Sequence, residues 1–343
     1  MSRLTPNQLL LGDVRDLLPT LPTASVDCVI TSPPYFRLRD YHDRKQIGLE
    51  PSIDDWVRDL RRALRETARI LKPTGGLWLN VGDTYSRHES QGAKPKSLLL
   101  GPERLAVALA EDGWVVRSKV IWAKTNPMPT SVQDRLSCTH ETFYFAVRSR
   151  RYYFDLDAIR VPHRSRPPTP RRLGPAPPLD RPDWVGPAAG DNGGLDRQKV
   201  KGVVGHPLGK NPGDVWQQAT ANYRGAHHAV FPVDLITRPL LASCPERICI
   251  RCGQPWQREP VRRLGRLALL GQLSPACGCG APWQPGLVLD PFMGAGTVAL
   301  AAETQRRDWL GIELNPAFAA LAQKRLADAR GATHAERDAA RAA

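Results

Sequence analysis

The segment Thr31-Ser32-Pro33-Pro34-Tyr35 combines groups that could hold an exocyclic amine together with the flat ring that carries it. The hydroxyl of Ser32 and the carbonyl oxygen of Pro33 can each accept a hydrogen bond from an amine proton. The two prolines stiffen the turn and hold that carbonyl outward. Tyr35 offers a face for stacking on a base that has left a duplex. If the segment stood alone, an ordinary Pro-Pro turn after a strand would be the favoured interpretation.

A second candidate site is the segment Asp290-Pro291-Phe292-Met293-Gly294-Ala295-Gly296-Thr297. Its glycines allow the backbone to approach a ligand closely, and the helix expected to begin at Thr297 would attract negative charge at its N-terminus. The next expected strand leads to Glu313, whose carboxylate could bind ribose hydroxyls. Asp290 could face the cationic end of a cofactor. A dinucleotide site normally has the fuller G-x-G-x-x-G pattern, but position 299 is alanine.

Four of the seven cysteines form two close pairs, Cys249-x-x-Cys252 and Cys277-x-Cys279. In an intracellular chain such spacings favour a metal site over disulfides. The two pairs predict tetrahedral thiolate ligation of a structural zinc ion in a small zinc-ribbon-like insertion. Reduced thiols without metal are the alternative. The surrounding arginines suit either a contact with DNA or a solvated basic surface; they are Arg251, Arg258, Arg262, Arg263 and Arg266.

The elements that would position these groups alternate between strands and helices. Apolar and β-branched runs predict strands at Gln8–Leu11, Val26–Thr31, Leu77–Val81, Trp114–Trp122, Glu141–Val147, Leu287–Leu289 and Trp309–Ile312. Helical spacing of apolar residues predicts helices at Asp54–Leu71, Pro102–Asp112, Thr297–Thr304 and Pro316–Arg330, with Lys72–Gly76 stopping the first. This alternation predicts an α/β protein with a doubly wound, mainly parallel, Rossmann-like sheet. Both candidate segments then follow strand ends, where α/β active sites gather.

The composition fits a packed protein with an anionic partner. Of 343 residues, 41% are hydrophobic and 24% charged, which suffices for a core and argues against global disorder. No apolar run reaches the length of a membrane span, and the N-terminus has no apolar signal core. We therefore expect a soluble, cytoplasmic bacterial protein that associates with the nucleoid and not with a membrane. The formal net charge is +14, so nucleic acid is the expected partner.

The composition of the chain changes after the strand expected at Glu141–Val147, where proline becomes frequent. Nine prolines lie between Pro162 and Pro187, which fits either a disordered linker or a basic arm beside DNA phosphates, and both interpretations stay open. The predicted organisation is a catalytic half at 1–150, a basic Pro/Gly-rich segment at 151–204, a cofactor-lining segment at 205–244, the zinc-ribbon-like insertion at 245–285, a cofactor-binding half at 286–330 and a tail at 331–343.

The combination of motifs resembles the beta group of DNA amino-methyltransferases, which modify cytosine N4 or adenine N6 with S-adenosylmethionine. The resemblance rests on Ser32-Pro33-Pro34-Tyr35 and on the Asp290–Thr297 loop, in that order along the chain. It continues through Asn80–Tyr85, Trp122–Pro129, Gly209–Trp216 and His228–Pro232, and so covers most of residues 8–147 and 205–330. It implies S-adenosylmethionine as cofactor and double-stranded DNA as partner. It also implies that the target base is flipped out and that the methyl group is transferred directly.

The resemblance implies a role for each motif position. The catalytic residues would be Ser32, Pro33, Pro34 and Tyr35, with Ser32 and Pro33 orienting the amine and Tyr35 holding the base. Gly12 and Asp13 would contact the cofactor adenine, and Glu313 would hold its ribose. The other implied cofactor-binding residues are Thr31, Phe231, Pro232, Asp290, Phe292, Gly294, Gly296 and Thr297. Members with serine at the first motif position are more often cytosine-N4 enzymes, so we favour cytosine N4 and keep adenine N6 as the alternative.

Other classes of function fit the sequence less well. Cytosine-C5 methylation needs a cysteine nucleophile, usually in Pro-Cys, and Cys28, Cys138 and Cys244 lack that context. We interpret these three as ordinary buried thiols. A non-catalytic, zinc-dependent DNA-binding protein would not need both loops intact, and the incomplete glycine pattern opposes a nucleotide-dependent oxidoreductase. The recognition sequence, the oligomeric state and a cognate restriction endonuclease acting separately stay open.

Overall fold

The computed structural model contains two compact units. The first comprises residues 1–158, 213–257 and 273–343, and the second residues 159–212 and 258–272. The residues that the structure describes are 4–41, 43–163, 206, 208–221, 231–259, 263–264, 267–268 and 271–342. The first unit contains the large sheet, its helices and both candidate segments. Both candidate segments therefore belong to one compact unit.

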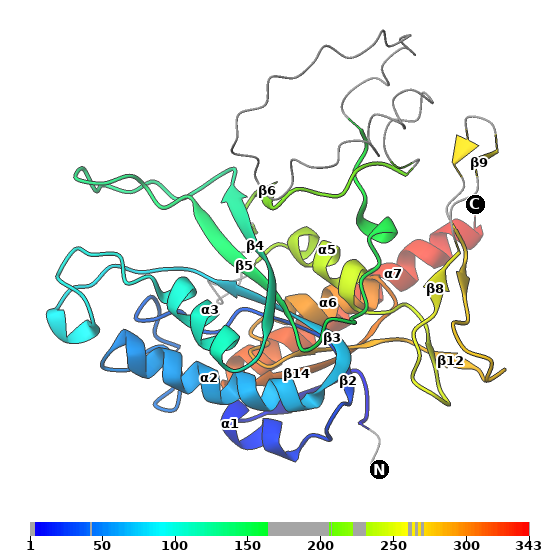
Figure 1. The fold of residues 1–343 in the computed structure, drawn as a ribbon, viewed down its shortest axis with the longest axis horizontal. Coiled ribbons are helices and arrows are strands. Elements are labelled where there is room, and N and C mark those ends of the chain that lie inside the picture. Colours follow the sequence, from blue (N-terminus) through cyan, green and yellow to red (C-terminus); the bar gives the residue numbers. More distant parts are fainter. Residues whose placement is uncertain are drawn as a thin grey trace, which may run out of the picture. The chain divides into compact units, whose positions relative to one another are not determined.

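An eight-stranded sheet runs through the first unit (Figure 1). In spatial order its strands are β1 (Gln8–Leu11), β14 (Asp308–Glu313), β13 (Leu287–Asp290), β2 (Val26–Thr31), β3 (Leu71–Val81), β5 (His140–Val147), β4 (Val115–Lys124) and β6 (Val215–Gln218). Neighbouring strands are parallel except where β5 pairs with β3 and β4. The predicted mainly parallel α/β sheet is therefore confirmed.

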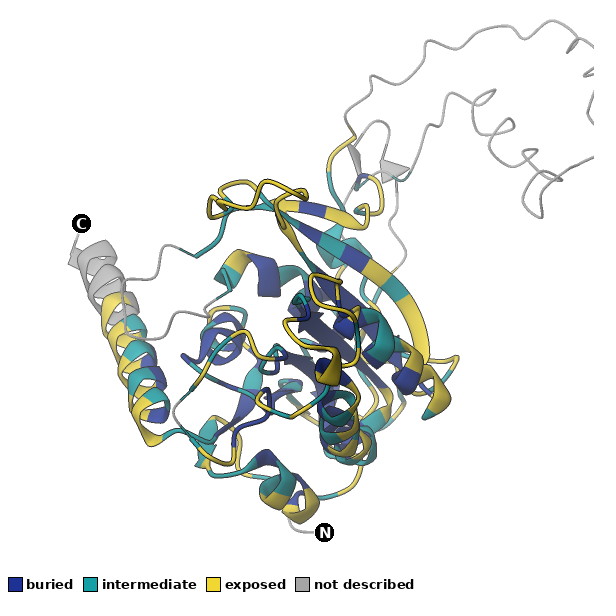
Figure 2. Ribbon diagram, turned by 90° about the vertical axis from the view of Figure 1, so that its left-hand side faces the viewer, coloured by how far each residue is buried: buried dark blue, intermediate teal, exposed yellow. Residues whose placement is uncertain are grey.

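Helices pack on both faces of this sheet. One core includes side chains of α1 (Val14–Leu17), α2 (Ile53–Ile70) and α3 (Gly101–Glu111), and the other those of α5 (Val233–Ser243), α6 (Thr297–Thr304) and α7 (Pro316–Ala342). Alternate strand residues divide between the two cores, with Val29 in the first and Cys28 and Ile30 in the second, as strand geometry requires. Figure 2 shows the buried residues concentrated in the central strands and on the inner sides of the helices.

Helix α2 follows its sequence pattern closely. The hydroxyl of Ser52 accepts a hydrogen bond from the backbone N–H of Asp55 and caps the helix. Trp56, Leu60 and Leu64, spaced by four residues, are almost fully buried. Burying such a side chain stabilises the fold by about 1.5–3 kcal/mol. The helix therefore provides a rigid support beneath the strand ends.

The end of α2 differs from the prediction. Lys72–Gly76 does not separate helix and strand, because β3 begins directly at Leu71. The pairing of β2 with β3 shifts in register at this point: Val26 pairs with Leu71, but Cys28, two residues later, pairs with Gly76, five residues later. The additional residues therefore lie on β3. This irregularity accommodates a proline that cannot donate to a strand neighbour.

Several elements have no clear sequence pattern. Helix α5 contains Pro239, which normally signals a break, and β6 has only four residues. Helix α7 continues to Ala342, beyond the end predicted at Arg330 and through the residues predicted as a tail. The remaining short strands are β7 (Ile248–Cys249), β8 (Gln257–Arg258), β9 (Arg263–Leu264), β10 (Leu267–Ala268), β11 (Leu273–Ser274) and β12 (Trp283–Gln284).

Two further sequence predictions concern the thiols and the basic segment. Cys28 and Cys244 are buried, but the prediction is wrong for Cys138, which lies exposed in the connection between β4 and β5. Most of the Pro/Gly-rich segment, residues 164–204, lies outside the described residues, as do His228, Arg262 and Arg266. Within the described ranges, none of the helices is both long and apolar enough for a membrane span.

Candidate active site

The sheet brings together the two candidate segments, which lie far apart in the sequence. Strands β2 and β13 are parallel neighbours, with Cys28 opposite Val288, so both segments leave the same edge of the sheet. At that edge the hydroxyl of Thr31 donates a hydrogen bond of 2.7 Å to the carboxylate of Asp290, across 259 positions of sequence. Both residues are buried. This contact joins the predicted catalytic turn directly to the predicted cofactor loop.

The turn after β2 is held from behind by the helix α2. The indole N–H of Trp56 donates to the carbonyl oxygen of Pro34 at 2.9 Å. Gly48, at a φ of +110°, packs against the same turn, and a Cβ there would lie 3.1 Å from the carbonyl oxygen of Tyr35. Only glycine combines that backbone conformation with so close an approach. The turn is therefore fixed by residues outside its own motif.

Tyr35 is held on two sides. Its ring lies against the backbone of Gly82, where a Cβ would come within 2.6 Å of the ring. Its hydroxyl lies 2.7 Å from a carboxylate oxygen of Glu141, 3.0 Å from the amide oxygen of Asn80 and 3.3 Å from the hydroxyl of Ser32. Burial, and then the negative charge of Glu141, raise the pKa of Tyr35 well above its usual range, so the phenol stays protonated.

Glu141 also has a cationic partner. One carboxylate oxygen accepts from Tyr35 and from the amide of Asn80, and the other lies 2.6 Å from the ammonium nitrogen of Lys124. Both charged side chains are mostly enclosed, with 21% of Lys124 and 17% of Glu141 exposed. The pair is therefore part of the site wall and is screened by water less than a surface ion pair.

The loop after β13 is organised around Glu313. The backbone N–H of Gly294 donates to one carboxylate oxygen of Glu313 at 2.7 Å, and that of Asn315 donates to the other at 2.8 Å. The N–H of Gly12 donates to the backbone carbonyl of Glu313. Burial raises the pKa of Glu313 above its usual value, although these backbone donors oppose the shift. The acid, the glycine loop and the β1 turn thus meet at one place.

Asp290 is the most deeply enclosed acid at this edge of the sheet. It is 3% exposed, and desolvation raises its pKa to about 7 despite the hydrogen bonds from Thr31 and from the backbone of Phe292. A neighbouring positive charge would favour its ionised form. The position therefore suits a carboxylate that acts near a cationic group.

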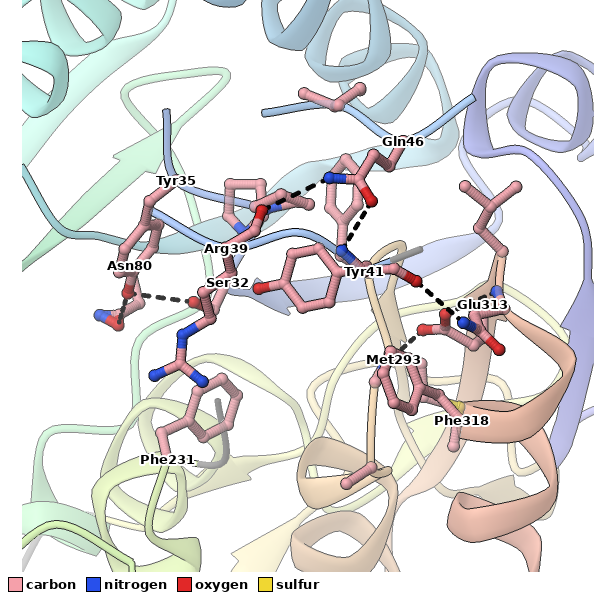
Figure 3. Close-up of a pocket in the computed structure, with 18 of the residues that line it drawn as sticks. Ser32, Tyr35, Arg39, Tyr41, Gln46, Asn80, Phe231, Met293, Glu313 and Phe318 are labelled. Carbon is pink, nitrogen blue, oxygen red and sulfur yellow. Dashed lines mark hydrogen bonds between the residues drawn. The ribbon is translucent and has the colours of Figure 1, made fainter. Parts of the chain in front are cut away.

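A cavity of about 420 Å³ lies between the two segments, a size typical of small-molecule sites. In Figure 3, Ser32, Tyr35 and Asn80 gather on one side and Met293, Glu313 and Phe318 on the other. The predicted site residues that line the cavity are Ser32, Pro33, Pro34, Tyr35, Gly12, Asp13, Phe231, Phe292, Gly294, Thr297 and Glu313.

Four of the predicted catalytic and cofactor-binding residues lie outside the cavity wall. Thr31 and Asp290 bond to each other behind it. Pro232 precedes α5 as its N-terminal cap. Gly296 has a φ of +75° and lies against Ala322 of α7, 3.1 Å from where its Cβ would be. Its backbone shape is thus needed here for packing one helix against another.

Asn80, Lys124 and Glu141 also line the cavity, although no role was predicted for them from the sequence. Asn80 lies near the end of β3, and Glu141 lies near the beginning of β5 opposite Trp122. Because β5 runs against its neighbours, its first residues meet the carboxyl ends of the parallel strands. A polar residue at the start of an antiparallel strand was the signal that could have identified Glu141.

Tyr41 and Phe318 line the cavity on a different side. Their rings meet edge to face at 6.1 Å between centroids. The amide of Asn315 donates to the backbone carbonyl of Tyr41 at 3.0 Å, which ties the segment after the catalytic turn to the residues after Glu313. No sequence pattern indicated this aromatic pair.

The four paired cysteines come together elsewhere in the first unit. The Sγ atoms of Cys249, Cys252, Cys277 and Cys279 all lie within 4.8 Å of one another. Strand β7, which contains Cys249, pairs with β12 at Trp283. Hydrogen bonds from the backbone of Cys252 and Arg251 lower the pKa of Cys249 to about 7. Four thiols at this spacing form a donor set that fits a tetrahedral zinc ion, whose bonds to sulfur are about 2.3 Å long.

The chain is similar to known proteins both in sequence and in fold. Residues 26–324 match the family model described as DNA methylase, N6_N4_Mtase. The Type II methyltransferase M.Cfr9I of Citrobacter freundii is 32% identical over 92% of this chain and 86% of its own length. The structure of the cytosine-N4-specific PvuII DNA methyltransferase has a TM-score of 0.57 at 15% identity, over 95% of this chain and 92% of that one.

A second solved structure has a similar fold. It is a putative DNA modification methylase from Thermus thermophilus in complex with S-adenosyl-L-methionine, with a TM-score of 0.52 and 22% identity. The similarity covers 94% of each chain. At this level of identity the two solved structures show that the fold is shared.

Proposed function

Because the chain belongs to the N6/N4 family of DNA methylases, we propose that it transfers the methyl group of S-adenosylmethionine to the N4 amine of cytosine in double-stranded DNA. The observation that carries this proposal is the meeting of the Ser32–Tyr35 turn and the Gly294 loop on opposite sides of one cavity. Such an arrangement suits two reactants that must face each other for direct transfer.

The proposed cofactor side of the cavity is the one formed by Gly12, Phe231, Gly294 and Glu313. S-adenosylmethionine supplies an electrophilic methyl group on a sulfonium. Glu313 has both oxygens directed by backbone donors, and its remaining acceptor capacity would hold ribose hydroxyls. Asp290, behind the wall, would favour the cationic end of the cofactor through its charge.

The proposed base side is formed by Ser32, Pro33 and Tyr35. Ser32 and Pro33 would accept the two amine protons and turn the amine nitrogen towards the methyl group. The lone pair of that nitrogen is delocalised into the ring, so orientation and stabilisation of the developing positive charge are the contributions the protein can make. Tyr35 would support the flipped base from one side.

The choice between cytosine and adenine rests on Ser32. A neutral hydroxyl at this position is more typical of cytosine-N4 enzymes in the family that the sequence resembles, and aspartate is more typical of adenine-N6 enzymes. Adenine N6 is the alternative target. Nucleoside analysis of duplex DNA treated with the protein and labelled cofactor tests the choice. We expect the label in N4-methylcytosine. Label in N6-methyladenine would instead identify adenine N6 as the target.

We also propose that a zinc ion is held by Cys249, Cys252, Cys277 and Cys279, in a small insertion next to the methyltransferase sheet. The support is the 4.8 Å limit on all distances between the four sulfur atoms. Freshly purified protein should contain about one zinc per chain by elemental analysis. Cys277→Ser should lose that metal, whereas Cys138→Ser, at an exposed thiol that is not part of the cluster, should keep it. Metal-free wild-type protein prepared without chelators would contradict the proposal.

A further inference from the structure

Glu141 lies outside the two motifs that identify the family, yet it binds three side chains on the base side of the cavity. Its Oε2 accepts from Tyr35 at 2.7 Å and from Asn80 at 3.0 Å, and its Oε1 pairs with Lys124 at 2.6 Å. Each of these three contacts holds the carboxylate in place through a charge-assisted hydrogen bond. Glu141 is therefore a fixed negative charge at the far end of a row of hydroxyl groups.

The row of hydroxyls has a direction. Tyr35 has one phenolic proton and two acceptors within reach, Glu141 at 2.7 Å and Asn80 at 3.0 Å. The shorter, charge-assisted bond to the carboxylate is the stronger one and takes the proton. The phenol oxygen then offers only lone pairs to Ser32, whose Oγ lies 3.3 Å away. The hydroxyl of Ser32 therefore donates to Tyr35.

The direction of the Ser32 hydroxyl decides whether it helps or hinders methyl transfer. A serine hydroxyl can rotate to donate or to accept. If Ser32 donated its proton to the amine nitrogen, it would occupy the lone pair that must form the new bond to carbon. If its proton already points to Tyr35, the hydroxyl can only accept, and it holds an amine proton while leaving the nitrogen lone pair free.

We propose that Glu141 is a positioning residue that orients the hydroxyl row from Ser32 through Tyr35 to its own carboxylate, and so keeps Ser32 an acceptor for the target amine. Lys124 supports this role by holding the charge of Glu141. The inference rests on the proposed function, because it concerns the same amine. It adds a requirement that the motifs alone do not contain: an anion on β5, 106 positions after Tyr35.

Glu141→Gln tests the role with little change in shape. The amide can donate to the Tyr35 oxygen and reverse the row, so the single-turnover rate of methyl transfer should fall roughly 10- to 100-fold. Cofactor affinity should change little, whereas the thermal midpoint should fall because Lys124 loses its charged partner; the rate is therefore measured at a temperature where the variant is folded. The matched control is Glu103→Gln. Glu103 of α3 lies 2.6 Å from Lys119 of β4, in an ion pair that is exposed to solvent. That variant should transfer methyl groups at the wild-type rate.

A double-mutant cycle distinguishes this role from a general electrostatic effect. Tyr35→Phe removes the middle of the row, so Glu141→Gln should cause almost no further loss of rate in that background. Losses that multiply would show that Glu141 acts independently of Tyr35 and would overturn the proposal. So would a wild-type rate in Glu141→Gln, or a loss of rate matched by a loss of cofactor affinity. Absence of methyl transfer by the wild-type protein would instead overturn the proposed function itself.

Discussion

The turn after β2 and the loop after β13 leave neighbouring strands of one sheet, but the chain holds them in different ways. The loop is held mainly from within and by the next strand: Gly296 bonds to Met293, and Gly294 to Glu313, only 19 positions on. The turn is held by Trp56 of α2 and by Glu141 of β5, 106 positions from Tyr35. The geometry of the loop is therefore set mainly by residues close to it in the sequence, and that of the turn mainly by residues that only the assembled fold brings near.

Because of this difference, we expect mutations in the loop and mutations in the turn to impair different steps. Because the loop carries its own geometry, a change inside it should affect the cofactor and little else. Because the turn depends on distant supports, its motif can stay intact while its chemistry weakens. Cofactor affinity and the rate of methyl transfer, measured separately, compare the two segments, since a shared defect of folding would move both.

The largest effect is expected for Gly294→Asp in the loop. A carboxylate would fill space beside the cavity and would face Glu313, whose oxygen lies 2.7 Å from the Gly294 nitrogen. Calorimetric binding of S-adenosylmethionine should be abolished in a folded variant. Gly113→Asp is the control, because Gly113 also has a positive φ, +86°, but has no neighbour within 4 Å of a Cβ. Unchanged affinity in Gly294→Asp would remove this loop from the proposed cofactor site.

Ser32→Ala in the turn should lower the rate of methyl transfer and leave cofactor affinity nearly unchanged. Loss of one positioned hydrogen bond in a transition state typically costs about 2.7–4 kcal/mol, or about 100- to 1,000-fold in rate. The carbonyl of Pro33 remains, so some activity should persist. Affinity for S-adenosylmethionine should stay near that of the wild type, because Ser32 lies on the proposed base side of the cavity, across from Glu313 (Figure 3). Single-turnover transfer at the wild-type rate would exclude Ser32 from the active site.

The sequence predicted the loop more completely than the turn for the same physical reason. Strand, glycines, helix start and acid follow one another from Leu287 to Glu313, so a local pattern contains the geometry. The motif around Ser32 was also visible. The residues that hold this motif in place were not visible in the sequence, because Glu141 reaches the motif only when β5 pairs antiparallel with β3 and β4. Asp290 was expected at the ligand but lies behind the wall, bonded to Thr31.

The fold shows the same division between local and distant information. Helix α6 and strands β1 and β2 have the predicted bounds, since each is a continuous pattern. The start of β3 at Leu71 was missed, because its register shift depends on pairing with Val26 and Cys28. Helix α5 was not predicted from the sequence; it contains Pro239, and the packing of its buried residues Ile236 and Leu240 stabilises the helix around that proline.

Gly82→Ala tests the support of Tyr35 without touching the motif. A Cβ there would lie 2.6 Å from the ring, so the ring or the strand end must move, at a cost of about 1–3 kcal/mol. The rate of methyl transfer should fall by roughly 10-fold, because a displaced ring also strains the hydrogen bond to Glu141. Gly331→Ala, in open space on α7, should keep the wild-type rate. Equal rates for both variants would show that the position of Tyr35 is not critical.

The smallest effect is expected for Trp56→Phe, which removes the donor to the Pro34 carbonyl and leaves the ring position filled. Trp56 is fully buried, so lost packing and an unpaired carbonyl should lower stability by about 1–3 kcal/mol. The control is Trp309→Phe, because Trp309 is also buried and its indole donates at 2.9 Å, but to Glu303, away from the cavity. Both variants should melt at lower temperature. Only Trp56→Phe should also lose rate at a temperature where both are folded, by roughly fivefold, equivalent to about 1 kcal/mol. If the two variants lose stability and rate alike, α2 supports the fold in general and does not hold the turn in place.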